Sequence, residues 1–442
     1  MPRSKKNIIP LVAGLYLLAL GFFLWGIAVG KYQVFPWSHF QSMYEELHAY
    51  FTFEEAPEKT ATEKVMLHHQ ENRSEFDFGG LKIRDTSFQD PGYLLISGFS
   101  KSYNQVVVEL FSIADNSVLH RWLPDVDKIL AQTPQFSDGP NMVKSYQVQH
   151  PLLLEDGGLV FTSGAGPMVK INGCGDIEWV LVHKFHHSIE RDHQGNIVTC
   201  SKLEGDGPGT ILPIRDDGIA VISPDGQLLD EYSITKILLD NRHKALIYGI
   251  GRFEHNRIHL NDAQPVLQDS DHAKKGDVLV SIRHLSTVAL IEPKSGEIKW
   301  LRTGPWLNQH DINPLPDGRY SIFGNDMVRG YDKAGNLLVE KDKSDIYIYD
   351  PSTDTVTQPY SSVMQRERIA SLTQGRSRVL ANGDAYVEQT DSARMLRISE
   401  TGVRWEYVNA VSENTVGALH WSRYLSDSEV DLSWLENLTC NQ

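Results

Sequence analysis

The chain has 442 residues and a mass of 49.9 kDa, enough for two or three average domains or for one large all-β unit. Hydrophobic residues make up 41% and charged residues 22%, a globular composition that excludes wholesale disorder. The formal net charge is −15, because 57 Asp and Glu outnumber 42 Lys and Arg. Such a protein would repel a phosphate backbone, so nucleic acid is not an expected partner.

The first expected element is an apolar helix over residues 8–30. This run carries no formal charge and, as a helix, would be roughly 34 Å long, which is enough to cross a hydrocarbon core. A basic tail, residues 1–7, precedes it and many Glu residues follow it, so the positive-inside rule predicts a cytoplasmic N-terminus. We expect a single-pass signal anchor that places the rest of the chain in the periplasm or an equivalent outside space. The alternative is a cleavable signal peptide, since Ala28–Gly30 resembles a cleavage site.

The segment after the apolar run is expected to form a juxtamembrane helix and a linker. Apolar residues from Phe40 to Phe51 recur at helical spacing, and few turn residues interrupt them. The expected division of the chain is a basic tail at 1–7, the transmembrane anchor at 8–30, the juxtamembrane helix and linker at 31–85, and a single large domain at 86–442.

From about Gly92 onward, short apolar or alternating runs are separated by turn sequences that are typical of β-hairpins. One series of turns sets a glycine beside Asp or Asn just before a strand, at Gly157, Gly195, Gly276, Gly318 and Gly383. Two of the gaps between these glycines are near 40 residues and one is near twice 40. That period is expected of four-stranded propeller blades.

A second series of turns sets a glycine before an alternating strand that ends in Trp or an aliphatic residue. Its members are Gly175, Gly226, Gly296, Gly335 and Gly402. This pattern fits an outer hairpin that packs its aromatic residue between adjacent blades. The five copies and the strand-rich region 92–125 together predict an all-β fold: a six-bladed β-propeller preceded by a single N-terminal transmembrane helix.

The three cysteines are too few and too scattered for a disulfide scaffold or a zinc knuckle. One bridge between Cys174 and Cys200 is conceivable in an oxidising compartment. The other interpretation is that Cys174, Cys200 and Cys440 are unpaired buried thiols.

Polar residues that could carry chemistry recur at His186-His187-Ser188, at His259 to Asp262, at Ser281 to His284 and at Gln309 to Asp311. Each group is expected just before or within an inner strand, so a propeller could bring all four to one axial mouth. Imidazoles can supply a nucleophile, a base or proton donors, and a guanidinium can hold an oxyanion. The combination suits transfer of an anionic group, although each histidine read alone could be an ordinary strand-end residue.

The stretch 183–326 resembles the bacterial aryl sulfotransferase family that does not use a nucleotide sulfate donor. The strings that carry the resemblance are FHHSIERDHQGNIVT, RIHLNDAQPV, GDVLVSIRHLSTVALIEPKSGEIKW and LNQHDINPLPDGRYSIFGND. A further string near the C-terminus, RSRVLANGDAYVEQTDSARMLRISETGVRWEYV, resembles the closing blade of that family. The similarity covers roughly residues 145–410.

The resemblance implies a six-bladed propeller that moves a sulfuryl group from a phenolic ester to another hydroxyl by a ping-pong route, with no cofactor and no metal. It implies that His310 is the covalent nucleophile and that Arg283 holds the sulfuryl oxygens. His187 and His259 would protonate the leaving phenolate. The residues that could orient these imidazoles are Asp311, Asn261, Asp262 and His186. The expected partners are an aryl sulfate donor, a hydroxyl acceptor and the membrane.

The chain departs from the family pattern at Phe323–Asp326, where many members read FDNG, and in the HHS wording where HD is frequent. Two other functions stay open. One is a metal-dependent hydrolase or lyase in which the axial histidines hold zinc or another divalent ion. The other is a non-catalytic propeller that serves as a binding module. Arg283 discriminates against the metal enzyme, because a cation aimed at the site opposes a metal ion and suits a sulfate.

Overall fold

The computed structural model describes residues 8–32, 67–69, 78–136, 145–206, 214–249, 255–331, 337–341, 343–413 and 415–440. The chain forms two compact units, Met1–Thr60 and Ala61–Gln442. The predicted basic tail and most of the predicted juxtamembrane helix and linker lie outside the described residues.

The first unit contains the apolar helix α1 (Ile8–Tyr32). Its window Val12–Val29 has a mean hydropathy of 2.2, and the described side chains of this window are almost all exposed. The helix has 25 residues, so it is long and apolar enough to cross a membrane. Its last turn contains Lys31, and its first turn contains no acidic residue. Both a membrane anchor and a signal sequence have these properties.

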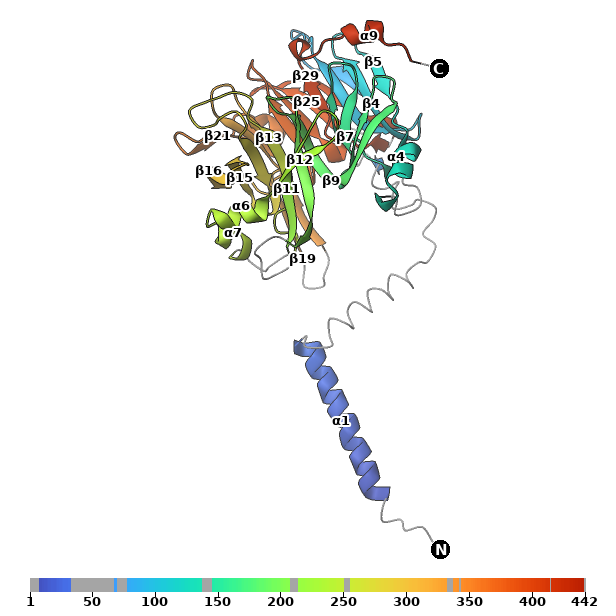
Figure 1. Cartoon of the computed structure of the whole chain (residues 1–442), viewed down its shortest axis with the longest axis vertical. Helices are drawn as coiled ribbons and strands as arrows, with labels where there is room; N and C mark the ends of the chain where they lie inside the picture. The colour runs from blue at the N-terminus through green and yellow to red at the C-terminus, as the bar shows by residue number, and fades with distance from the viewer. Residues whose placement is uncertain are drawn as a thin grey trace. The chain divides into compact units, whose positions relative to one another are not determined.

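The second unit consists of antiparallel sheets in a propeller-like arrangement (Figure 1). One four-stranded sheet contains, in spatial order, β13 (Leu260–Pro265), β14 (Val278–Ile282), β15 (Thr287–Glu292) and β16 (Glu297–Thr303). The next contains β17 (Asp311–Pro314), β18 (Tyr320–Gly324), β21 (Asp345–Asp350) and β22 (Thr355–Thr357). Between β18 and β21 the chain forms a separate hairpin of β19 (Met327–Tyr331) and β20 (Leu337–Lys341).

Two further sheets join the beginning of the domain to its end. A five-stranded sheet contains β2 (Gly80–Ile83), β26 (Val403–Val408), β25 (Arg394–Ile398), β24 (Ala385–Gln389) and β23 (Arg376–Val379). A four-stranded sheet contains β29 (Arg423–Leu425), β3 (Tyr93–Ser100), β4 (Gln105–Ser112) and β5 (Ser117–Trp122). The small third sheet contains β1 (Leu67–His69), β28 (Thr415–Gly417) and β27 (Ala410–Ser412).

The largest sheet has seven strands: β12 (Leu228–Ser233), β11 (Arg215–Ile222), β10 (Ile197–Asp206), β9 (Ile177–Arg191), β8 (Gly166–Ile171), β7 (Leu159–Thr162) and β6 (Gln149–Leu153). Strand β9 is shared between two sets of partners. Its first part pairs with β8 and its last part pairs with β10, with Phe185 paired to both neighbours. The inner strands β6, β9, β13, β17 and β23 contact one another in this order, which gives the sheets a common axis.

The described helices of the second unit are short connections. They are α4 (Val126–Gln132), η2 (Pro134–Phe136), α6 (Ile234–Asp240), α7 (Lys244–Tyr248), η3 (Arg283–Leu285), α8 (Ser361–Arg366), η4 (Thr390–Ser392), η5 (Asp427–Glu429) and α9 (Ser433–Asn437). The apolar core lies between neighbouring sheets rather than at one centre.

The turn glycines of the first series are confirmed. All five have positive φ, and each lies in the turn between the first and second strands of its sheet or half-sheet. The tryptophans of the second series also pack as predicted. Trp179 donates to Pro224 O in the next hairpin, Trp300 stacks near Tyr320 of the next sheet, and Trp405 donates to Asp90.

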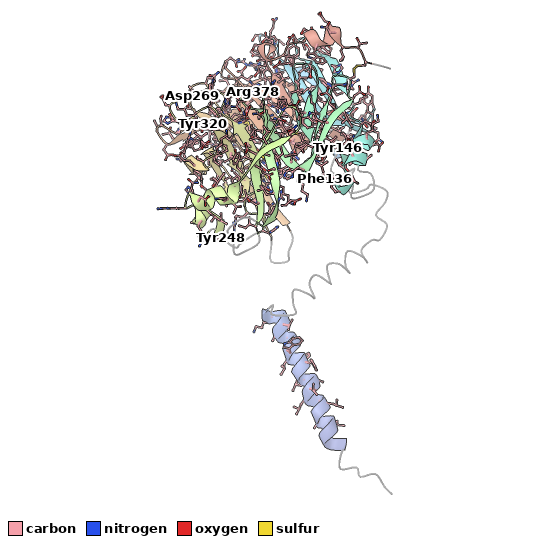
Figure 2. All side chains as sticks on the ribbon, viewed as in Figure 1. Phe136, Tyr146, Tyr248, Asp269, Tyr320 and Arg378 are labelled. Carbon is pink, nitrogen blue, oxygen red and sulfur yellow. A yellow bond between two sulfur atoms is a disulfide. The ribbon has the colours of Figure 1, made fainter. Side chains whose placement is uncertain are left out.

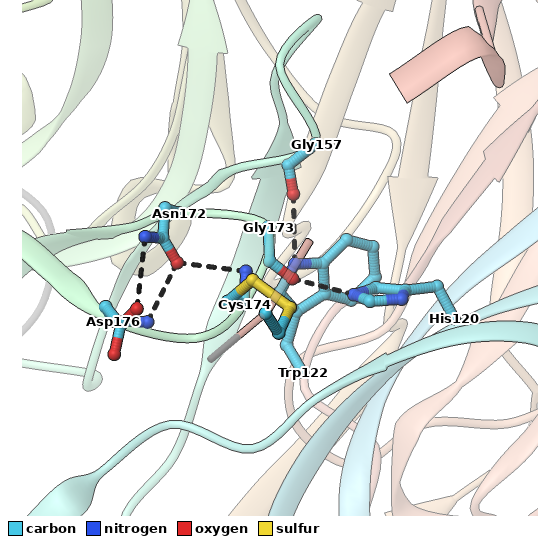
Figure 3. The surroundings of a disulfide bond; sticks show 8 residues. His120, Trp122, Gly157, Asn172, Gly173, Cys174 and Asp176 are labelled. Carbon is cyan, nitrogen blue, oxygen red and sulfur yellow. Dashed lines mark hydrogen bonds between the residues drawn. A yellow bond between two sulfur atoms is a disulfide. The ribbon is translucent and has the colours of Figure 1, made fainter. Parts of the chain in front are cut away.

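Of the two interpretations of the cysteines, the Cys174–Cys200 bridge is wrong, and the unpaired buried thiol is correct for Cys200 alone. Cys174 forms a disulfide with Cys440, 266 residues away in sequence (Figure 3). Cys200 is a free thiol buried in the core on β10. Cys174 instead lies on the turn between β8 and β9, where Asn172 Oδ1 accepts its backbone N–H at 2.9 Å. The bridge therefore fastens the C-terminal tail to this turn.

Candidate functional site

Three of the predicted histidines meet at the axial end of the inner strands. His187 lies within β9, His259 directly precedes β13, and His310 directly precedes β17. The ring centre of His187 is 5.7 Å from that of His259 and 5.9 Å from that of His310. The fold thus brings together side chains that are up to 123 residues apart in sequence (310 − 187).

Local irregularities in the strands aim these histidines at one another. His187 and His259 have left-handed backbones, with φ of 61° and 48°, which β-strands of L-residues do not ordinarily contain. The pairing of β9 with β10 shifts register beside His187, and the pairing of β13 with β14 shifts just after His259. Bulges of this kind change the direction of side chains. The irregular hydrogen bonding between these strands therefore turns the histidines toward one another.

His310 is held in a defined tautomer by Asn325. The Nδ2 of Asn325 donates to Ser371 O at 2.9 Å and to Gln374 O at 2.8 Å, so its Oδ1 is the atom that faces His310. This oxygen lies 2.6 Å from Nδ1 of His310, which must therefore carry the proton. Nε2 of His310 has the free lone pair and accepts the backbone N–H of Gln374 at 3.0 Å.

His187 is the inner end of a buried chain of polar groups. Its Nδ1 lies 2.8 Å from Nδ1 of His186, and Nε2 of His186 lies 3.7 Å from Oδ1 of Asp217, an ion-pair distance. The other oxygen of Asp217 accepts the backbone N–H of Leu260 at 2.9 Å, next to His259. Burial acts to raise the pKa of Asp217, but His186 and Arg215 outweigh it and the pKa lies below its usual value. Asp217 is therefore an anion that braces two of the histidine positions.

Arg283 lies on η3, in the turn between β14 and β15, and not before or within an inner strand as its sequence group predicts. The reason is that the second and third strands of a blade are joined at the same end of the sheet where the inner strand begins. Nη1 of Arg283 lies 3.0 Å from Nε2 of His284, whose ring centre is 4.4 Å from that of His259. The side-chain amide of Asn256 lies 2.8 Å from Nδ1 of His259 and leaves Nε2 of that ring for other contacts.

The three imidazoles are neutral at physiological pH. Burial, followed by the charge of Arg283, places the pKa of His310 well below its usual value. Burial and then the neighbouring imidazoles, His186 first, do the same to the pKa of His187. Burial, His284 and Arg283 lower the pKa of His259 to about 3. A neutral imidazole with a free lone pair is a competent nucleophile or base.

The residues expected to orient the imidazoles fasten neighbouring inner strands. Asn261 Nδ2 donates to Gln309 O at 3.2 Å, and Asp262 accepts the Ile312 N–H at 2.9 Å. Asp311 accepts the Ser377 N–H at 2.9 Å, and burial raises the pKa of both carboxyls. His186 is the expected orienting residue that contacts a site imidazole directly.

Sequence reasoning missed Asn256 and Asp217, described above, and three further neighbours of the cluster. Trp421, buried just before β29, places its ring centre 5.8 Å from His187 and 6.2 Å from His310. Asn325 lies within the FGND string, where the departure from the family wording was a usable signal. Gln374 and Trp421 lie in segments without a motif, so no local pattern marks them.

No group of three or more His, Cys, Asp or Glu side chains with the arrangement of a metal site occurs among the described residues. What the arrangement supplies is a nucleophilic nitrogen, two further neutral imidazoles and one guanidinium in a largely buried setting.

A family model described as arylsulfotransferase (ASST) matches residues 152–410, more than half of the chain. No curated protein matches. Among solved structures, a protein of unknown function from Bacteroides caccae aligns at 12% identity with a TM-score of 0.48, covering 76% of this chain and 99% of its own. Virginiamycin B lyase from Staphylococcus aureus aligns at 13% identity with a TM-score of 0.37, covering 77% of this chain and 98% of its own.

Proposed function

Because this chain belongs to the arylsulfotransferase family, we propose that it transfers a sulfuryl group from an aryl sulfate ester to a hydroxyl acceptor through a sulfohistidine at His310. No nucleotide donor takes part. The observation that carries the proposal is the tautomer of His310: Nδ1 carries the proton, Nε2 bears the lone pair, and the ring centre lies 5.9 Å from that of neutral His187.

In the first half-reaction, Nε2 of His310 attacks the sulfur of the bound ester. An N–S bond forms, the bond between sulfur and the phenolic oxygen breaks, and the oxygen leaves with the electron pair. His187 or His259 gives that oxygen a proton. Gln374 releases Nε2 before the attack, and its backbone N–H is then free to donate to a sulfuryl oxygen.

In the second half-reaction, the hydroxyl of the acceptor attacks the sulfur of the sulfohistidine. A new S–O bond forms, the N–S bond breaks, and Nε2 of His310 recovers its lone pair. The acceptor proton goes to the imidazole that protonated the leaving phenolate, which restores the starting state. The same base and acid therefore serve both halves of a ping-pong cycle.

The charge of the substrate completes the electrostatics of the site. In the free protein the charge of Arg283 lowers the pKa of His187, His259 and His310. A sulfate ester brings one negative charge, which offsets Arg283 and permits one imidazole to become protonated and act as the acid. Arg283 can bind two sulfuryl oxygens with its planar fork and oppose the charge that develops in the transition state.

We also infer a six-bladed propeller. The seven-stranded sheet divides at Phe185 into two four-stranded halves that share β9, and the remaining four blade-like sheets bring the total to six. A non-glycine residue with positive φ occurs near the start of each of the six inner strands: His150, His187, His259, Asn308, Gln374 and Trp421. This recurrence supports six equivalent units. We further infer that α1 is a signal anchor and that the catalytic unit lies outside the cytoplasm, where the disulfide can form.

The test uses the full chain in detergent micelles, incubated with 4-nitrophenyl sulfate in the absence of an acceptor and examined by peptide mass spectrometry. We expect one added sulfuryl group on the peptide that contains His310, and its removal when phenol is added. His310→Ala abolishes the adduct, whereas the matched control His193→Ala, an exposed histidine on the turn after β9, retains it.

Two outcomes would contradict the proposal. If transfer proceeds in His310→Ala, or the group is found on another residue, the sulfohistidine at this position is wrong. If neither an adduct nor transfer occurs with a panel of aryl sulfates, the chain is not an aryl sulfotransferase, and the binding-module hypothesis replaces it.

A further inference from the structure

The loop between α8 and β23 contains the backbone N–H that contacts the proposed nucleophile. Residues 371–375 form this loop, and it leads into β23, whose Arg378 is labelled in Figure 2. Gln374 donates its N–H to Nε2 of His310 at 3.0 Å. The backbone of Gln374 is left-handed, with φ of 54°, a conformation that is unfavourable for a residue other than glycine and that persists only where the surroundings enforce it. The position of this N–H therefore depends on what holds the loop.

Side chains accept all five backbone N–H groups of the loop. In chain order from residue 371 to residue 375, the accepting side chains are Ser344, Asp391, Asp391 again, His310 and Thr390. Side-chain acceptors of this kind replace the backbone acceptors that a helix or a sheet would supply. Each peptide group of the loop is therefore tied to a specific side chain, and four of the five bonds surround the one to His310.

Asp391 makes two of these bonds, directly before the donor. Its Oδ2 accepts the N–H of Leu372 and, at 3.2 Å, that of Thr373, whose hydroxyl lies 3.4 Å from Oδ1. Hydrogen bonds to a carboxylate are stronger than those between neutral groups. The peptide group that donates to His310 joins Thr373 to Gln374, so it begins at a residue that Asp391 holds.

Asp391 occupies the same place in its sheet as Arg283 does in another sheet. Asp391 lies on η4, in the turn between β24 and β25, and Arg283 lies on η3, in the turn between β14 and β15. Both short helices end at a left-handed residue, Ala393 with φ of 52° and Ser286 with φ of 48°. Equivalent turns at the axial end therefore present a guanidinium in one sheet and hold a backbone donor in the other.

The carbonyl groups of the loop are held by the residue that sets the tautomer of His310. Asn325 Nδ2 donates to Ser371 O at 2.9 Å and to Gln374 O at 2.8 Å, and its Oδ1 lies 2.6 Å from Nδ1 of His310. One asparagine thus fixes both the imidazole and the loop that contacts it. The donor and the nucleophile are fixed relative to each other before a substrate arrives, which is the condition for preorganised electrostatic stabilisation.

We propose that Asp391 is the positioning residue for the backbone donor of Gln374. When the sulfate ester binds, its sulfuryl group takes the place of this N–H at Nε2 of His310, and the N–H donates instead to a sulfuryl oxygen. The bonds to Asp391 and Asn325 keep the displaced donor beside the sulfuryl group, so that sulfur stays in line with Nε2. The inference rests on the proposed sulfotransferase for the use of the donor, whereas the anchoring of the loop does not.

Hydrogen–deuterium exchange of the full chain in detergent tests the anchoring without a reaction. In Asp391→Ala the peptide of residues 370–376 should exchange about tenfold faster or more, because two amides lose their acceptor. Asp391→Asn should protect it nearly as the wild type does, since one amide oxygen can accept both N–H groups. The matched control is Asp192→Ala. Asp192 is also half-buried and accepts the N–H groups of Gln194 and Asn196 at 2.8 Å, but in the β9–β10 turn at the other end of its sheet, so its loss should leave 370–376 unchanged.

Steady-state transfer from 4-nitrophenyl sulfate to phenol tests the use of the donor. Asp391→Ala should lower kcat about 10- to 100-fold and leave KM within about twofold, because a misplaced donor weakens binding of the transition state more than binding of the ester. Asp391→Asn should stay within about threefold of the wild type, although it lacks the same charge, and Asp192→Ala should match the wild type.

The pH profile distinguishes positioning from a general structural loss. The Gln374 N–H donates to the lone pair of Nε2 and so favours the neutral form of His310. Weakening this bond in Asp391→Ala raises the pKa of His310, so the acidic limb of kcat/KM should move to higher pH. A smaller amount of folded protein would lower the whole profile without moving its limb.

The outcomes separate this inference from the proposed function. If exchange follows the expected pattern but the wild type transfers no sulfuryl group, Asp391 remains the residue that positions the donor and the proposed function fails. If the wild type transfers the group but Asp391→Ala keeps its kcat, or Asp391→Asn loses as much as Asp391→Ala, the positioning role is overturned. Unchanged exchange of residues 370–376 in Asp391→Ala would overturn it as well. Should Asp391→Ala fail to fold, Thr390→Val and Thr390→Ser take its place, because valine removes and serine keeps the hydroxyl that accepts the Gly375 N–H.

Discussion

Two buried polar clusters of this protein differ in where their counter-charges come from. In one, Asp90 receives Arg397 Nη1 at 2.7 Å, Trp405 Nε1 at 2.6 Å and Tyr424 Oη at 2.8 Å, at the junction of the sheets that contain β3 and β25. Anion and cation both belong to the chain. In the histidine cluster, burial first, and then repulsion among the imidazoles and Arg283, lowers the pKa values of His187 and His310.

The comparison shows how a buried polar cluster that stabilises the fold differs from one that serves a function. A cluster that neutralises itself stabilises the fold, and its individual groups matter to the free energy of unfolding. A cluster that lowers the pKa of its own bases stays neutral until an anion arrives, and its groups matter to the reaction. The predictions below test whether each cluster behaves in the way assigned to it.

Asp90→Ala should produce the largest effect on stability. The substitution leaves the guanidinium of Arg397 buried with Asp384 as its acidic partner among the described residues, and breaking a buried pair costs about 3–5 kcal/mol. Urea unfolding measures the loss, and Asp350→Ala, which removes a half-buried carboxylate at the end of β21, is the control. Transfer activity per folded molecule should not change. A loss of activity without a loss of stability would mean that the Asp90 cluster is functional.

Arg283→Met should lower the transfer rate about 100- to 1000-fold, because it removes donors aimed at charge that develops in the transition state. The free energy of unfolding should change little compared with Asp90→Ala. Steady-state kinetics with 4-nitrophenyl sulfate give the rate, and Arg319→Met, a half-exposed arginine on the turn before β18, serves as the control. If Arg283→Met transferred the sulfuryl group at the wild-type rate, Arg283 would not stabilise the negative charge of the transition state.

Asp217→Asn should lower the rate about 10- to 100-fold, since Asp217 braces His186 and through it His187 without touching the substrate. The informative readout is the dependence on the leaving group. Esters of weakly acidic phenols need the proton more, so they should slow more than 4-nitrophenyl sulfate does. A uniform slowing across the series would indicate a purely structural role for Asp217.

The pH profile should show the smallest effect. His310 must be neutral to attack, and its pKa lies well below the usual value near 6.5. Therefore kcat/KM should hold as the pH is lowered from about 8 to about 6.5 and should fall only at lower pH, where His310 becomes protonated. Arg283→Met removes one cause of the lowered pKa, so its acidic limb should move to higher pH. An acidic limb near 6.5 in the wild type would show that the nucleophile is not in this buried environment.

The sequence allows prediction of features that local chemistry decides. Glycine turns can be predicted because a positive φ is a local requirement, and the site histidines can be predicted because their strings carry a family resemblance. The tautomer of His310 depends on Asn325, whose side-chain orientation is fixed by hydrogen bonds to Ser371 and Gln374. Those two residues lie in the connection between α8 and β23, so the sequence around His310 does not predict the tautomer. The position of Trp421 beside the cluster depends on the closing strand β29.

The disulfide shows the same limit. Cys174 and Cys200 are close in sequence, but Cys200 lies on β10 inside the core while Cys174 lies on a turn at the edge. The partner of Cys174 arrives from the last residues of the chain. Spacing along the sequence cannot reveal a contact that exists only when the ring of sheets is closed.

That closure determines when the histidine cluster can be completed during folding. Strands β3, β4 and β5 are synthesised early, yet their innermost partner is β29, Arg423–Leu425. Until those last residues emerge, β3 has an open edge of the kind that attracts other chains, and contacts of such long sequence separation form late in folding. Trp421 joins His187 and His310 only in that final step. A chain that lacks β29 thus holds His187, His259 and His310 but not the β29–β3 pairing beside which Trp421 contacts two of them.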